Sequence, residues 1–158
     1  MMLYMIELVK AFVAAFLGTI AFSLIYHVPT YFYPYCGLIG GLGWVCYKIG
    51  VFVGGSVSES AFFATVLVVC FSRLYAVRKR CPATVFLISG IFPLVPGAGI
   101  YWTAYYLVVN DLSRALTKGF ETVKVAIAIV LGIVIIFELP QKIFMTKEQR
   151  KQLRKQKK

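Results

Sequence analysis

The sequence contains few of the side chains on which most enzymes and metal proteins depend. Its 158 residues include one histidine, four cysteines and six acidic residues. No two cysteines are spaced as CxxC, and only His27 could complete a metal-binding set, so the sequence predicts neither a metal site nor a disulfide framework. It also offers no nucleophile–base pair and no phosphate-binding loop, and we therefore expect neither an enzyme nor a cofactor.

Apolar residues, in contrast, make up 60% of the chain. A soluble domain of this size could not bury so much apolar surface, whereas a lipid bilayer can accommodate it. A signal peptide does not explain the first apolar segment, because that segment lacks a basic n-region and a clean cleavage site. The sequence therefore predicts an all-α integral membrane protein with about five transmembrane helices, near residues 3–26, 35–53, 60–77, 82–109 and 120–139.

Basic residues give the chain a net charge of +11, and they are unevenly distributed. Eight of the 17 lysines and arginines follow Pro140, where Glu148 is the single acid. We therefore divide the chain into a transmembrane domain, residues 1–140, and a basic tail, residues 141–158, that lies in solvent or on lipid headgroups. Membrane lipids are expected partners, and nucleic acid is not.

The same charges predict the orientation in the membrane. Five spans place both the tail and Arg78-Lys79-Arg80 on one side, and the positive-inside rule makes that side cytoplasmic. The opposing charges, Arg114 and Lys118, are fewer. We expect a multi-pass protein of the plasma or inner membrane, with a cytoplasmic C-terminus and the N-terminus outside. A first segment that lies flat, or a fourth that re-enters, would change the number of spans but not the position of the C-terminus.

The fourth apolar segment is interrupted near its middle by Pro93, Pro96, Gly97 and Gly99. Each proline removes an N–H donor and crowds the preceding turn, so an ordinary α-helix cannot continue through this stretch. A second half-helix starting here would direct the N–H groups from Gly97 to Ile100, and the positive end of its dipole, at the break. Transporters with discontinuous helices bind carboxylates at such ends. The alternative is a simple proline kink whose polar groups are satisfied by neighbouring helices.

Glycines recur along the second span in a pattern typical of close helix packing. Gly37 and Gly41 form one GxxxG pair, and Gly50 and Gly54 form another. Lys48 lies on nearly the same helix face as the first pair. Its ammonium group either extends to the membrane surface or faces an internal cavity.

Local charge and capping patterns mark the ends of other spans. Glu7 and Lys10 are three residues apart and are expected to pair on one helix face. Ser56 or Ser58 is expected to cap the third span, with Glu59 in its first turn.

Two further charges lie near predicted span ends. Arg73, near the end of the third span, is either an interfacial anchor or a buried charge that lines a pathway. Asp111 belongs to a predicted polar connection over residues 110–118, before the fifth span begins near Phe120.

Three sequence features together resemble a known transporter family. They are Tyr26-His27-Val28-Pro29 after the first span, Gly40-Gly41-Leu42-Gly43 followed by Lys48 in the second, and Pro93-Leu94-Val95-Pro96-Gly97 in the fourth. This arrangement resembles the small C-terminal domain of threonine/serine exporter (ThrE-type) proteins, which many bacteria carry as a separate subunit. The resemblance covers most of residues 1–140, and the proline–glycine stretch is its specific part.

The resemblance implies a transporter with two halves of about five spans each, one of which a larger subunit supplies in split systems. It also implies export of small carboxylate-bearing solutes, threonine and serine or in some split pairs succinate, coupled to the proton gradient. The chain departs from the family in its long basic tail and in having Lys48 where an arginine is expected. A lysine binds a carboxylate as a point charge rather than through two parallel hydrogen bonds.

The broken fourth segment and the family resemblance together predict a membrane transporter subunit that works with a larger ThrE-type subunit or as a homo-oligomer. Glu59, Arg73 and Asp111 are candidate coupling or pathway charges. The alternatives are a channel, or a non-transporting membrane scaffold whose basic tail recruits partners. The predicted substrate-binding residues are Lys48, Pro93, Pro96, Gly97, Ala98, Gly99, Ile100, Tyr101 and Thr103, with Trp102 beside them on the cavity wall.

Overall fold

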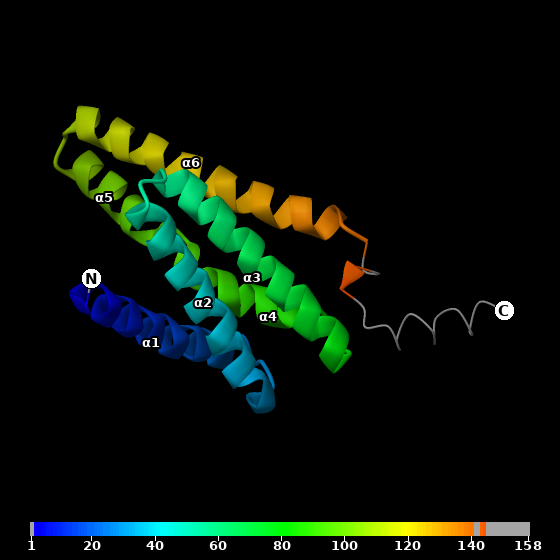
Figure 1. The fold of residues 1–158 in the computed structure, drawn as a ribbon. Helices are drawn as coiled ribbons and strands as arrows, with labels where there is room; N and C mark the ends of the chain where they lie inside the picture. Colours follow the sequence, from blue (N-terminus) through cyan, green and yellow to red (C-terminus); the bar gives the residue numbers. More distant parts are fainter. Residues whose placement is uncertain (1, 141–142, 145–158) are drawn as a thin grey trace.

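The computed structural model describes residues 2–140 and 143–144, and these are arranged as a bundle of helices (Figure 1). The predicted all-α class is confirmed, and no strand occurs within the described residues. Apart from residues 143–144, the predicted basic tail lies outside the described part of the chain. The helices are α1 (Met2–Ile25), α2 (Tyr33–Phe52), α3 (Val57–Lys79), α4 (Thr84–Ile91), α5 (Gly97–Val108) and α6 (Leu112–Glu138), with 3-10 turns η1 (Thr30–Phe32) and η2 (Phe92–Leu94).

Four helices, α1, α2 with η1, α3 and α6, are each long and apolar enough to cross a bilayer. The segments α4–η2 and α5 together form a fifth such unit, and its two halves are bent by 49°. Figure 1 shows the N-terminus at the same end of the bundle as the α2–α3 and α5–α6 turns, with the α1–α2 and α3–α4 turns at the opposite end. This alternation agrees with about five spans, of which the fourth is broken at the Pro-x-x-Pro-Gly stretch.

The capping and pairing patterns of the sequence are reproduced at two helix ends. Ser56 is the N-cap of α3: its hydroxyl accepts the Glu59 N–H at 3.2 Å, and the Glu59 carboxylate accepts the Ser56 N–H at 2.9 Å. This reciprocal arrangement satisfies two donors that the first turn of a helix leaves free. On α1, the Lys10 ammonium lies 3.2 Å from the Glu7 carboxylate, as the spacing predicts.

Helix α6 begins eight residues earlier than the sequence indicates, at Leu112 instead of near Phe120. Asp111 is its N-cap, because the Asp111 carboxylate accepts the Arg114 N–H at 3.1 Å. Asn110 just before it has a φ of 62°, the left-handed conformation that ends a helix. The predicted polar connection over residues 110–118 is therefore wrong: most of its polar side chains lie on the exposed first turns of a helix.

The glycines of α2 allow α1 to approach closely. A Cβ added at Gly37 or Gly41 would lie 2.9 or 2.7 Å from a phenylalanine ring of α1, and one at Gly40 would overlap the buried side chain of Thr19. The first predicted GxxxG pair is thus a packing surface. In the second pair only Gly50 packs closely: a Cβ there would lie 2.8 Å from the Ser60 hydroxyl of α3, whereas Gly54 lies in the turn after α2 with a φ of 98° and has open space around it.

The tightest core lies where α2, α3 and α4 meet, whereas α5 is peripheral. Ile39, Val68 and Phe86, one from each of those three helices, are fully buried. Helix α5 has no buried residue and packs mainly against α6. Within the described residues, the half-helix after the break is therefore held chiefly by α6.

Arg73 of α3 binds the C-terminal end of α6. Its side chain is 6% exposed, and its Nη1 donates to the carbonyl oxygens of Ile136 and Phe137, the second at 3.4 Å. The guanidinium also lies over the rings of Phe137 and Phe144, 5.5 and 4.6 Å from their centres. A cation is favourable at this position, because the last carbonyls of a helix lack partners and carry its negative dipole end.

Replacing Gly40 by valine should loosen the contact between α1 and α2. Because Thr19 leaves no room for a side chain, we expect Gly40→Val to lower the free energy of unfolding by about 1–3 kcal/mol. The measurement is a denaturant titration of the detergent-solubilised protein. Gly18→Val is the matched control, since a Cβ at Gly18 meets no heavy atom within 4 Å. Equal unfolding free energies for the two variants would contradict the packing described here.

Replacing Arg73 by methionine should detach the end of α6. The change keeps most of the side-chain volume but removes the donors to Ile136 and Phe137, so the same titration should show a loss of about 2 kcal/mol. Arg78→Met on the exposed end of α3 serves as the control and should change stability little. If Arg73→Met were no less stable than Arg78→Met, the hydrogen bonds from Arg73 to the end of α6 would not contribute to stability.

Candidate functional site

The break in the fourth span opens onto a cavity of about 580 Å³ between α2, η2, α5 and α6. We call it the break cavity. Five of the predicted site residues line it, namely Pro93, Pro96, Gly97, Ala98 and Gly99. The structure thus places a cavity where the sequence predicts interrupted backbone, as expected for broken helices in membrane proteins.

Two backbone amides at the start of α5 remain free to bind a ligand. The Gly97 N–H donates to the Val95 carbonyl at 2.7 Å, and the Ile100 N–H donates to the Pro96 carbonyl at 3.1 Å. The N–H groups of Ala98 and Gly99 have no acceptor within the described structure, and the preceding Pro96 provides no side-chain cap. The predicted set of four N–H donors is therefore reduced to these two, which we call the α5 amides.

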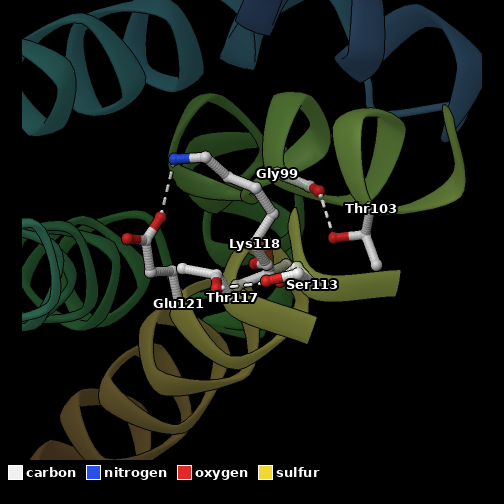
Figure 2. Close-up of polar contacts among 7 residues, drawn as sticks. Gly99, Thr103, Ser113, Thr117, Lys118 and Glu121 are labelled. Atoms are coloured by element: carbon white, nitrogen blue, oxygen red, sulfur yellow. Dashed lines mark hydrogen bonds and ion pairs between the residues drawn. The ribbon is translucent and has the colours of Figure 1, made fainter. Parts of the chain in front are cut away.

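An ion pair on α6 lies on the wall of the break cavity. The Lys118 ammonium is 2.8 Å from the Glu121 carboxylate, and the two side chains are 46% and 52% exposed (Figure 2). Because both side chains are only partly covered, each can exchange its partner for a solute without a large rearrangement. The cavity therefore has a cation and an anion within one helical turn of each other.

Small residues bring α5 close enough to α6 to place this pair beside the break. A Cβ at Gly99 would overlap Thr122, and one at Gly119 would lie 3.3 Å from Thr103. The two threonine hydroxyls bond to their own helices: Thr103 donates to the Gly99 carbonyl (Figure 2), and Thr122 to the Lys118 carbonyl, both at 2.7 Å. The glycine–threonine contacts therefore allow close packing without an unpaired hydroxyl.

Aromatic side chains form much of the remaining wall. Trp44 and Tyr47 extend from α2, with ring centres 5.1 Å apart, and Trp102 and Tyr106 extend from α5, with ring centres 6.0 Å apart. Trp44 and Trp102 are the two tryptophans of the chain. Their fluorescence therefore reports on this cavity.

Lys48 does not line the break cavity. Its ammonium lies 5.6 Å from the centre of the Trp44 ring, on a second cavity of about 350 Å³ that Glu7 and Lys10 also line. Trp44 contributes to both cavities and stands between them. Helical periodicity places Lys48 on the same face as Trp44, but the cation at the break is Lys118.

Three predicted residues of α5 also lie away from the break cavity. Thr103 lines a groove on another side of the α5–α6 pair, together with Gly119 and Phe120. Ile100 and Tyr101 are 55% and 61% exposed and do not contribute to the wall.

The three candidate pathway charges all have structural contacts. Glu59 and Asp111 cap the starts of α3 and α6, and Asp111 also lies 3.3 Å from the Arg114 side chain. Glu59 additionally lines a groove with Ser60 between α2, α3 and α6. Arg73 binds the end of α6, as described above.

Sequence reasoning did not identify Lys118, Glu121, Trp44, Tyr47 or Tyr106 as site residues. The sequence does contain a signal for Lys118 and Glu121, because Asp111 is a favourable N-cap residue. A helix that begins after Asp111 places Lys118 and Glu121, three residues apart, on one face. No comparable signal marks Trp44 and Tyr47, whose position depends on how α2 crosses the broken span.

Comparison with known proteins identifies the family. No solved structure matches the chain. The sequence model of the family described as "Threonine/Serine exporter, ThrE" matches residues 11–138, a range that includes the break cavity and nearly all of the helical bundle. The resemblance found in the sequence is confirmed, and the chain belongs to the threonine/serine exporter (ThrE) family of membrane transporters.

Proposed function

We propose that this chain forms part of an exporter for small carboxylate-bearing solutes, threonine and serine or a dicarboxylate such as succinate. The proposal rests on the break cavity, which is lined both by the residues that carry the free α5 amides and by Lys118. Backbone amides at a helix start bind carboxylates through hydrogen bonds and the helix dipole, and a nearby ammonium adds a full charge. Pro93 and Pro96 keep α4 and α5 from merging into one helix that would fill the cavity.

We further propose that a second membrane subunit, or a second copy of this chain, completes the passage. Helix α5 has no buried residue, and its aromatic side chains Tyr101, Trp102 and Tyr105 are 61%, 44% and 45% exposed. The resemblance to split exporters favours a larger ThrE-type partner. Coupling to the proton gradient rests on that resemblance alone.

The proposed orientation places the C-terminus in the cytoplasm. Arg78, Lys79 and Arg80 lie at the end of the bundle to which α6 also runs (Figure 1). At the opposite end, Arg114 and Lys118 are paired with carboxylates, so the uncompensated positive charge is on the C-terminal side.

A reporter fused to the C-terminus tests this orientation. We expect a fluorescent protein fused there to fluoresce in intact cells and alkaline phosphatase fused there to be inactive, because the first matures in the cytoplasm and the second outside it. The opposite pair of results would reverse the orientation of all the helices.

Filling the break cavity should abolish export. Gly97 lines the cavity, and a Cβ there meets no heavy atom within 4 Å, so a valine at this position adds bulk beside the cavity without displacing a helix. We expect Gly97→Val to lower export of labelled threonine from loaded cells at least about tenfold, because a misplaced ligand loses its binding geometry. Gly18→Val, which adds the same side chain to open space on α1, should export normally.

Binding is measured separately in the purified protein. Because both tryptophans line the break cavity, threonine should change the emission of the wild type and leave that of Gly97→Val unchanged. Equal amounts of membrane-inserted protein must be verified by immunoblot. Normal export by Gly97→Val at equal protein levels would disprove the proposed site.

A further inference from the structure

The break cavity contains equal numbers of opposite charges. Among the described residues that line it, the charged ones are Lys118 and Glu121, and they neutralise each other at 2.8 Å. The Lys118 ammonium bonds to Oε2 of Glu121, and Oε1 has no hydrogen-bond partner in the described structure. A ligand that separates the two side chains must therefore satisfy a cation and an anion together.

We propose that Lys118 and Glu121 together select zwitterionic amino acids over dicarboxylates. The solute carboxylate binds Lys118 and the α5 amides, and the solute ammonium binds Glu121. The ion pair is thereby exchanged for two ion pairs with the solute, and no charge is left without a partner. This inference rests on the proposed function and adds the basis of its substrate choice.

A dicarboxylate cannot make the same exchange. Its first carboxylate would occupy Lys118 and the α5 amides, and its second would face Glu121 or leave that carboxylate without its Lys118 partner. Like charges held close together at a binding site repel each other and disfavour binding. Lys48 lies beyond Trp44 on the other cavity. Lys124, the further cation on α6 that also acts on Glu121, does not line the break cavity.

The aromatic wall supports the same assignment. Trp102 and Tyr106 line the break cavity from α5, across from the α6 helix that carries Glu121. The faces of aromatic rings attract an ammonium group and disfavour a carboxylate. An amino acid with a short side chain would thus place its cation between Glu121 and an aromatic surface.

The test compares three solutes that differ in charge. Cells that express the full chain, together with any subunit it requires, are loaded with labelled threonine, with 3-hydroxybutyrate, which is threonine without its amino group, or with succinate. The variants are Glu121→Gln, which removes the anion, and Lys118→Met, which removes the cation. Glu7→Gln is the matched control, because Glu7 forms an i,i+3 ion pair at 3.2 Å with Lys10 away from the break cavity.

The expected results separate the two roles. The wild type and Glu7→Gln should export threonine at least about tenfold faster than 3-hydroxybutyrate or succinate, and Glu121→Gln should reduce that preference by about tenfold. Lys118→Met should instead slow export of all three solutes. If Glu121→Gln does not accumulate in the membrane, Glu121→Asp provides the second test: it keeps the anion and should retain the preference at a reduced rate.

Two outcomes would overturn the inference alone, and a third would also overturn the proposed function. The proposed selection by Lys118 and Glu121 is wrong if the wild type exports 3-hydroxybutyrate as fast as threonine, or if Glu121→Gln keeps the wild-type preference. In both cases carboxylate export itself would stand. If the wild type exports none of the three solutes and none changes its tryptophan emission, the proposed function fails and the inference fails with it.

Discussion

A membrane helix that breaks inside the bilayer must find partners for the backbone groups that the break releases. In this chain the break at Pro93 and Pro96 leaves four N–H groups at the start of α5, of which two bond locally and two do not. The rest of the bundle meets this requirement by surrounding the break with a cavity. Helix α6 holds α5 through contacts between small residues, and aromatic side chains of α2 and α5 form the opposite wall.

The ion pair of Lys118 and Glu121 follows from the same constraint. A single charge beside the membrane interior would be costly, whereas a neutral pair that remains partly exposed is not. A solute that carries both charges can replace both partners of such a pair at once. On the proposal made above, a cavity built in this way favours solutes whose own charges cancel, and a free amino acid meets that condition at neutral pH.

Several of these features could be predicted from the sequence because they depend on local chemistry. Proline cannot continue a helix, so the break was predictable, and the capping box at Ser56 and Glu59 has a fixed spacing. The position of Lys118 was missed because charges after Asp111 resemble a loop unless Asp111 is taken as an N-cap. The aromatic wall depends on the crossing of α2 and α5, which separate segments of sequence do not specify. Lys48 shows the same limit: its helix face was predicted correctly, but Trp44 separates it from the break.

The exposed side of α5 determines what must cover the proposed site in the membrane. Within the described residues this half-helix has no buried residue and packs mainly against α6, yet it carries the amides of the proposed site. Within the bilayer, lipid can cover the apolar side chains of α5 but cannot fill a cavity that contains an ion pair and free amides. A protein surface that covers α5 would both hold the half-helix in place and close the cavity. These are the physical grounds for the second wall proposed above, which another subunit or another copy of the chain would supply to exclude lipid during transport.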